Sequence, residues 1–160
     1  MTKKKVKVYL ISRISEDAHL WNEKICSVLK NPIEVFMPHQ HNPYNLEHTK
    51  MPKSVFDTDL EAMKKCDIAL ALPEFGNDCS YEVGWFSNSS KPTVFYIDTQ
   101  MQWLRDWMVK GGLDYVVTEN PQTFQILKGD PILKHKKLLL ISKLEDLHST
   151  MLNIYKSKVK

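Results

Sequence analysis

Residues 67–72 read Asp-Ile-Ala-Leu-Ala-Leu, and this stretch decides the fold class. The run is almost entirely apolar, has the length of a strand and ends at Pro73. Such a run is typical of a buried strand. The chain then crosses a loop at residues 74–79 and enters a helix predicted to begin near Ser80. A strand that leads through a loop into a helix is the repeating unit of α/β folds.

The same unit recurs on both sides of this stretch. The segment at residues 6–12 is rich in β-branched and aromatic side chains, and Ser15 can cap a helix that follows it. Further strands are expected at residues 34–37, 93–97 and 115–117, and further helices at residues 55–65, 103–109 and 143–155. The alternation predicts a single α/β domain over residues 1–160. Its fold class is a doubly wound, flavodoxin-like or Rossmann-like, five-stranded and mainly parallel sheet with helices on both faces.

The composition is that of an ordinary globular protein, with 42% hydrophobic and 26% charged residues. The formal net charge of +3 results from 22 Lys and Arg against 19 Asp and Glu. Proteins that bind nucleic acids usually carry a more one-sided charge, so no nucleic acid polymer is expected as a partner. No apolar run reaches the ~20 residues that cross a bilayer, so no membrane is expected as a partner either.

The three cysteines are Cys26, Cys66 and Cys79, and they contain no CxxC pair. An odd number of cysteines in a chain without a signal peptide predicts reduced thiols and a cytoplasmic location. Cys79 could act as a thiol nucleophile, but no histidine stands at a recognisable partnering position, so a packing role is favoured.

Residues 38–52 are predicted to form a long polar loop, which is typical of a lid or a substrate loop. The loop holds three histidines, His39, His41 and His48. Their spacing matches no zinc-binding pattern, and no cysteine lies nearby. Neither a metal ion nor a cofactor is therefore predicted.

Polar residues gather where the predicted strands end, and in doubly wound sheets ligands bind outside these carboxyl ends. Glu82 lies in the first turns of the helix that follows residues 67–72, and Asp57 and Asp59 lie on the helix before it. A convergent pair of carboxylates is what cleavage of a glycosidic bond requires, because one attacks the anomeric carbon and an acid protonates the leaving group. A carboxylate near a helix N-terminus can also simply complement the helix dipole, so this alternative stays open.

A series of short motifs resembles the nucleoside 2-deoxyribosyltransferase family, and it spans most of the first ~125 residues. The motifs are Val8-Tyr9-Leu10, Val35-Phe36-Met37-Pro38, Thr58-Asp59-Leu60, Cys66-Asp67-Ile68, Glu82-Val83-Gly84 and Ser90-Lys91-Pro92-Thr93. No single motif is specific to the family, and the resemblance rests on their order.

The resemblance implies catalytic roles for three residues. Glu82 would be the nucleophile that forms a covalent deoxyribosyl-enzyme, and Tyr9 would hydrogen-bond to its carboxylate and orient it. Asp59 would hold the departing base and help to protonate it, although Asp57 and Asp78 stay open as proton donors. Two successive displacements at the sugar would return it with retained configuration.

Five further residues are expected to bind substrate: Ser12, Phe75, Asp78, Asp106 and Met108. Phe75 lies in the loop after residues 67–72 and could stack on a base. Asp106 and Met108 match an Asn-x-Met element of the family that reaches into the site of a neighbouring subunit. An Asp there would accept a hydrogen bond from a free 5′-hydroxyl and repel a 5′-phosphate. The resemblance therefore implies a homo-oligomer, a dimer or larger, with shared active sites.

The sequence departs from the family at two places. Gly76 stands six residues before Glu82, where the family usually has an Asp, and Asp78 stands only four residues before it. Asp78 either substitutes from a reshaped loop or caps the helix. Arg13 follows Ser12 where the family commonly has aromatic residues; it either binds a phosphate or a 2′-hydroxyl or is exposed to solvent.

The expected function is transfer of 2-deoxyribose from a deoxynucleoside to another nucleobase, with these small molecules as partners. One alternative is an N-glycosidase that hydrolyses a nucleoside or its 5′-monophosphate. Another is a nucleotide-sensing module without turnover, because this kind of fold hosts many functions. An NAD-cleaving enzyme is a third, although the chain lacks a dinucleotide glycine fingerprint.

Overall fold

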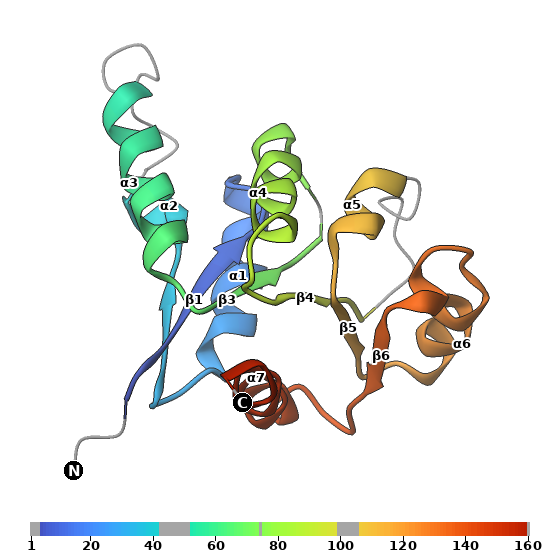
Figure 1. Cartoon of the computed structure of the whole chain (residues 1–160). Coiled ribbons are helices and arrows are strands. Elements are labelled where there is room, and N and C mark those ends of the chain that lie inside the picture. The colour runs from blue at the N-terminus through green and yellow to red at the C-terminus, as the bar shows by residue number, and fades with distance from the viewer. Residues whose placement is uncertain (1–3, 42–51, 74, 99–105, 160) are drawn as a thin grey trace.

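Six strands form the centre of the fold. The structure is a computed structural model that describes residues 4–41, 52–73, 75–98 and 106–159. In chain order the strands are β1 (Val6–Ile11), β2 (Ile33–Phe36), β3 (Ile68–Ala71), β4 (Thr93–Tyr96), β5 (Tyr115–Thr118) and β6 (Lys137–Leu140). They form one sheet in the order β2-β1-β3-β4-β5-β6, which Figure 1 shows from one edge to the other. Every neighbouring pair is parallel.

The doubly wound α/β prediction is confirmed, but the sheet has six strands where five are predicted. The chain starts at β1 inside the sheet, moves out to β2 at one edge and then crosses back to β3. This reversal between β1 and β3 is the switch point of the topology. In such sheets, loops diverge at the switch point and leave a crevice for a ligand at the carboxyl ends of the strands.

Helices connect the strands and cover both faces of the sheet. They are α1 (Glu16–Ser27), α2 (Pro38–His41), α3 (Pro52–Lys65), α4 (Asn77–Ser87), α5 (Trp107–Gly112), α6 (Pro121–Gly129), the 3-10 helix η2 (Leu133–His135) and α7 (Asp146–Val159). None of the helices within the described residues is long and apolar enough to cross a membrane.

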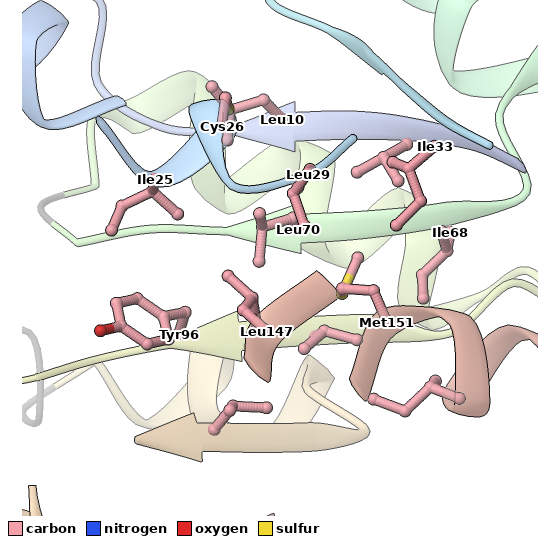
Figure 2. Close-up of a cluster of buried hydrophobic side chains, with 14 of the residues drawn as sticks. Leu10, Ile25, Cys26, Leu29, Ile33, Ile68, Leu70, Tyr96, Leu147 and Met151 are labelled. Atoms are coloured by element: carbon pink, nitrogen blue, oxygen red, sulfur yellow. The ribbon is translucent and has the colours of Figure 1, made fainter. Parts of the chain in front are cut away.

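One face of the sheet packs against α1 and α7. Figure 2 shows Leu10, Leu70 and Tyr96 of the strands meeting Ile25 of α1 and Met151 of α7. These side chains are almost fully removed from water. Their burial supplies the main favourable free energy of this layer, roughly 1.5 to 3 kcal/mol for each large apolar side chain.

The other face packs against α3, α4, α5 and α6. Tyr9 and Ile11 of β1 lie in this cluster together with Met63 of α3 and Val83 and Phe86 of α4. Successive side chains of a strand point to opposite faces of a sheet. Tyr9 therefore points to this face, while the residues before and after it in β1 belong to the cluster on the other face. The candidate site lies on this second face.

The sequence-based prediction lacks α2, α6, η2 and β6, of which α6 and β6 are the longest helix and the only strand. The Asn120 side chain caps α6 by accepting hydrogen bonds from the backbone N–H groups of Gln122 and Thr123, and Pro121 occupies the first turn. These cap and start residues are a recognisable signal for a helix. β6 is an edge strand with partly exposed side chains. Its short apolar run follows several lysines, so the sequence shows no clear strand pattern there.

Several boundaries also differ from the prediction. α4 begins at Asn77, three residues before Ser80, and α7 begins at Asp146. α2 occupies the start of the predicted loop at residues 38–52, while residues 42–51, with His48, lie outside the described residues. The predicted helix at residues 103–109 is wrong at its end, because α5 continues to Gly112; its start lies outside the described residues.

The three cysteines are free thiols and all are buried in the fold. A packing role for Cys26 and Cys66 agrees with their positions in the two apolar clusters. The cytoplasmic location stays a prediction.

Candidate active site

The site is centred on a hydrogen bond between the sheet and a helix. The Tyr9 hydroxyl donates to Glu82 Oε1 at 2.5 Å, across 73 residues of sequence. Tyr9 belongs to β1 and Glu82 to α4, the helix that follows β3. Because β3 is the neighbour of β1 in the sheet, the start of α4 is brought above the carboxyl end of β1.

The apolar pattern of α4 turns Glu82 toward Tyr9. Cys79, Val83 and Phe86 are the buried residues of this helix. Glu82 stands three residues after Cys79 and four before Phe86, a spacing that places it on the same side of a helix. The buried face of α4 therefore carries one carboxylate into an apolar layer.

Aromatic neighbours fix the ring of Tyr9, which is fully buried. Phe36 of β2 is paired with Tyr9 in the sheet register, and the two rings stack with centroids 5.5 Å apart and 14° between their planes. Phe86 of α4 lies on the ring as well, at 5.8 Å and 40°. Both aromatic neighbours restrict the ring of Tyr9, whose hydroxyl donates to Glu82.

The surroundings disfavour a negative charge on Glu82. The pKa of Glu82 is raised from 4.5 to about 8, chiefly by burial; the hydrogen bond from Tyr9 opposes this shift, and the charges of Asp59 and Asp78 add to it. The pKa of Tyr9 is raised well above its usual value, first by burial and then by the charge of Glu82. Tyr9 therefore keeps its proton and acts as a donor to Glu82.

Asp59 of α3 is the second carboxyl group of the site. Its Oδ1 is buried and has no hydrogen-bond partner among the described residues. Burial raises its pKa from 3.8 to about 6; the charge of His41 opposes this shift and that of Asp78 adds to it. A carboxyl group with such a pKa can give and take a proton near neutral pH.

Glu82 and Asp59 form a coupled pair, because the charge of Asp59 raises the pKa of Glu82. With values of about 6 and about 8, the pair holds one proton between these two pH values. Glu82 has the higher value and holds this proton most of the time, so the reactive state, an ionised Glu82 beside a protonated Asp59, forms when the proton moves from Glu82 to Asp59.

The other residues expected to bind substrate differ in their burial and in their contacts. Asp78 lies exposed in the first turn of α4, and its charge acts on both members of the pair. Ser12 is buried directly after β1. Phe75 is half-buried and its ring contacts Phe95, 5.6 Å away, in the apolar cluster, so it packs against the core instead of lying open in the loop.

Asp106 and Met108 flank the start of α5. Asp106 is exposed, and Met108 is 90% exposed. Within the described residues no hydrogen bond, ion pair or ring contact joins either of them to Tyr9 or Glu82 of the same chain. Their exposure leaves them available to another molecule.

Two alternatives for the chemistry lose support. Cys79 is almost fully buried, and burial raises the pKa of its thiol to about 12, so it is protonated at neutral pH. Asp57 forms an exposed ion pair with Lys53 at 2.5 Å, one helical turn away, in place of a buried contact with the pair. Asp59 is thus the better placed of the two acids on α3.

Sequence reasoning misses two aromatic contributors, Phe36 and His41. The His41 ring stacks on Phe36 with centroids 4.6 Å apart and 6° between the planes. Phe36 is thereby in contact with both His41 and Tyr9. The signal for Phe36 is its place at the end of the strand that pairs with β1, but nothing in the spacing of His41 marks it as part of the site.

Comparisons with known proteins cover this part of the chain. A sequence model of the family described as nucleoside 2-deoxyribosyltransferase matches residues 8–127. The matched region contains all the expected catalytic and substrate-binding residues. No curated protein matches the chain significantly.

Two solved structures have a similar fold. One is a 2-deoxyribosyltransferase from the psychrotolerant bacterium Bacillus psychrosaccharolyticus, with a TM-score of 0.53, 21% identity and a match that covers 69% of this chain and 85% of that one. The other is a conserved protein from Enterococcus faecalis V583, with a TM-score of 0.57, 17% identity and a match that covers 94% of this chain and 99% of that one. At these identities the likeness shows the fold alone.

The hydrogen bond at the centre of the site can be tested without a substrate. In Tyr9→Phe the ring stack is kept and the donor is lost, so the pKa of Glu82 should rise above about 8, by roughly one unit for a charge-assisted hydrogen bond. Carbon-13 NMR titration of the side-chain carboxyl groups measures this pKa. Tyr96→Phe is the matched control, because Tyr96 donates to Glu119 at 3.1 Å on the opposite face. An unchanged Glu82 pKa in Tyr9→Phe contradicts the geometry.

Proposed function

The chain belongs to the nucleoside 2-deoxyribosyltransferase family, and from this premise we propose that it cleaves the N-glycosidic bond of a 2′-deoxynucleoside and transfers the sugar to another nucleobase. The family consists of pentosyltransferases that act on N-glycosidic bonds. The observation that carries the proposal is the hydrogen bond from Tyr9 to Glu82 beside the ionisable Asp59. These are the groups that the two half-reactions need.

In the first half-reaction the Glu82 carboxylate attacks C1′ of the deoxyribose. The C1′–N bond breaks, its electron pair leaves with the base, and the proton of Asp59 passes to the base nitrogen. The products are a glycosyl ester on Glu82, a neutral free base and an ionised Asp59. Positive charge that develops on the sugar in the transition state is stabilised by the nearby carboxylates.

In the second half-reaction an acceptor base attacks the same carbon. Its nitrogen forms the new C1′–N bond, the ester bond to Glu82 breaks, and Asp59 takes the proton that the acceptor loses. Each step inverts the anomeric carbon, so the sugar is returned with its original configuration. Asp59 and Glu82 end in their starting states.

Tyr9 has an orienting role in this scheme. Its hydroxyl occupies Oε1 of Glu82, so Oε2 is the oxygen that is left for attack. The hydrogen bond also favours the ionised form of Glu82 against the effect of burial. The ring stack with Phe36 and Phe86 restricts where that oxygen can point.

We extend the proposal to a homo-oligomer in which α5 of one subunit completes the site of another. Trp107 and Met108 of α5 are 71% and 90% exposed, and Tyr81 of α4, which precedes Glu82, is 56% exposed. α4 and α5 pack against each other, so these apolar side chains belong to adjacent helices. Large apolar groups gathered in this way are typical of interaction surfaces. Asp106 would then accept a hydrogen bond from the 5′-hydroxyl in the partner's site.

Transfer itself is tested with purified protein, a deoxynucleoside such as deoxyinosine or thymidine, and a second free base. A new deoxynucleoside should form only when the acceptor base is present, and chromatography detects it. In Glu82→Ala the rate should fall at least about a thousandfold, because the nucleophile is gone. Glu119→Gln is the matched control, since Glu119 also accepts a tyrosine hydrogen bond but on the opposite face.

Other outcomes of this assay would count against the proposal. Free base released at the same rate without an acceptor would make the chain a hydrolase, and the same assay with 5′-monophosphates tests that alternative. A rate that is equal in Glu82→Ala and in the unchanged chain would remove Glu82 from the chemistry.

The pH dependence of kcat/KM should be bell-shaped, with limbs at about 6 and about 8. Below about 6 both carboxyl groups hold a proton and the nucleophile is lost. Above about 8 neither holds a proton and the general acid is lost. Initial rates at constant ionic strength across this range measure the profile. A rate that stays flat through both values would contradict the shared-proton description.

The assembly is tested by sedimentation velocity together with turnover. The unchanged chain should sediment as a dimer or larger, and Met108→Asp should shift it toward the monomer and reduce turnover, because a charge then replaces an apolar contact. Leu20→Asp is the control, since Leu20 is 77% exposed on α1 at the other face of the sheet. A monomer with full activity would refute the shared site.

A further inference from the structure

Lys91 contacts both of the helices that carry the carboxyl groups of the site. Its Nζ donates hydrogen bonds to two backbone carbonyl groups in the last turn of α3, those of Met63 at 2.9 Å and Lys64 at 2.5 Å. The same ammonium group lies over the ring of Trp85 of α4, 5.5 Å from its centroid. Lys91 belongs to one of the family-like motifs, yet the proposed chemistry gives it no role.

The backbone of Lys91 is tied to the end of α4 as well. Its N–H donates to Ser89 Oγ at 3.2 Å, and the Ser89 hydroxyl donates in turn to the carbonyl oxygen of Phe86 at 2.7 Å. Phe86 lies in the last turn of α4, and its ring is in contact with Tyr9. The side chain and the backbone of this one residue therefore connect the C-terminal ends of α3 and α4.

α3 and α4 lie on the same side of the sheet and share its apolar cluster (Figure 1). Both pack against β1, but in the described part of the chain their backbones approach each other at few points. Carbonyl groups in the last turn of a helix have no partner within the helix, and a lysine at that end satisfies them and complements the helix dipole. The contacts of Lys91 thus fix the end of α3 to a neighbour that it otherwise meets only through side chains.

These contacts lie one helical turn away from each carboxyl group. Met63 stands four residues after Asp59 on α3, and Phe86 stands four residues after Glu82 on α4. Residues with this spacing lie on the same side of a helix, in successive turns. Lys91 therefore holds the turns that directly follow the two carboxyl groups.

We propose that Lys91 is a positioning residue for the reaction, and that it sets the separation of Asp59 and Glu82 by holding the ends of α3 and α4 together. The inference rests on the proposed function, because it assigns Lys91 to the carboxyl pair of that same site. Proton transfer and nucleophilic attack both depend on how these groups are spaced, and a misplacement of about 1 Å can cost about a hundredfold in rate.

The test compares two substitutions of Lys91 with one at a similar lysine elsewhere. Lys91→Met keeps the apolar stem and removes the ammonium group, and Lys91→Arg keeps a cation that can donate to carbonyl groups and lie over Trp85. Lys137→Met is the matched control, because Lys137 Nζ donates to the Tyr115 hydroxyl at 3.2 Å and lies 5.0 Å from that ring's centroid, on the opposite face. Circular dichroism shows whether each variant is folded.

The first readout needs no turnover. In Lys91→Met the helices should separate and admit water, so carbon-13 NMR titration should show the pKa of Glu82 lowered from about 8 by roughly half a unit or more, since burial and the charge of Asp59 both raise it. Loss of a positive charge alone would raise this pKa instead, so the sign of the shift distinguishes position from charge. Lys91→Arg and Lys137→Met should leave the pKa at about 8.

The second readout is the division between kcat and KM. In Lys91→Met, kcat at neutral pH should fall about tenfold to a hundredfold while KM changes little, because the spacing of the reacting groups is disturbed and the contacts to substrate are kept. Lys91→Arg should restore most of kcat, and Lys137→Met should leave it unchanged. If Lys91→Met does not fold, Ser89→Ala, which removes only the tie to α4, is read in the same way.

A folded Lys91→Met chain that keeps both the pKa of Glu82 and kcat overturns the inference, because Lys91 would then serve stability alone. A raised pKa overturns it as well. If the unchanged chain turns over no nucleoside at all, the proposed function fails instead. The NMR titration distinguishes that outcome, since it reports on the spacing of the carboxyl groups without catalysis.

Discussion

The hydrogen bond between Tyr9 and Glu82 depends on more of the fold than any other contact in the site. Its donor belongs to an interior strand and its acceptor to a helix on one face, and it forms only if β3 lies beside β1. β3 lies beside β1 because the chain first forms β2 on the other side of β1 and then crosses back, which is the reversal in the strand order. Tyr9 must also face the side that α4 covers, so a register slip of one residue would turn it to the other side.

The same layer that positions Glu82 also works against its charge. With a folded-state pKa of about 8 against an ordinary 4.5, Glu82 binds a proton more tightly in the folded chain than in the unfolded chain. Its contribution to stability is therefore full below 4.5 and is lost as the pH rises through about 8. Asp59 acts in the same direction between 3.8 and about 6. The apolar cluster around Met63, Val83 and Phe86 must offset this, so reactive carboxyl groups are kept at some cost in stability.

Much of this arrangement follows from local sequence patterns. The apolar run at residues 67–72 and the alternation of strands and helices predict the doubly wound sheet, and the order of family-like motifs predicts the residues that meet at its switch point. α6 carries a readable signal in Asn120 and Pro121. β6 does not, because an edge strand needs burial on fewer sides and its three leucines follow a basic segment.

The part of the site that escapes sequence reasoning depends on distances between elements. The spacing of Asp57 and Asp59 does not tell which of them is buried, since one turn of helix can carry both an exposed ion pair and a buried carboxyl group. Phe75 stands in a loop, yet it packs against Phe95. His41 has no informative neighbours in sequence, and its position becomes meaningful only when β2 sets Phe36 beside Tyr9.

In the proposed reaction a single base subsite has to serve twice. The leaving base receives its proton from Asp59, and the acceptor base must return a proton to the same group before the next cycle. Because the second half-reaction is the first in reverse, both bases approach C1′ from the side of Asp59. The groups that surround Asp59, including His41 and Asp78, therefore act on donor and acceptor alike. Preferences for the leaving base and for the acceptor base then have one physical origin, and a change at this carboxyl group alters both together.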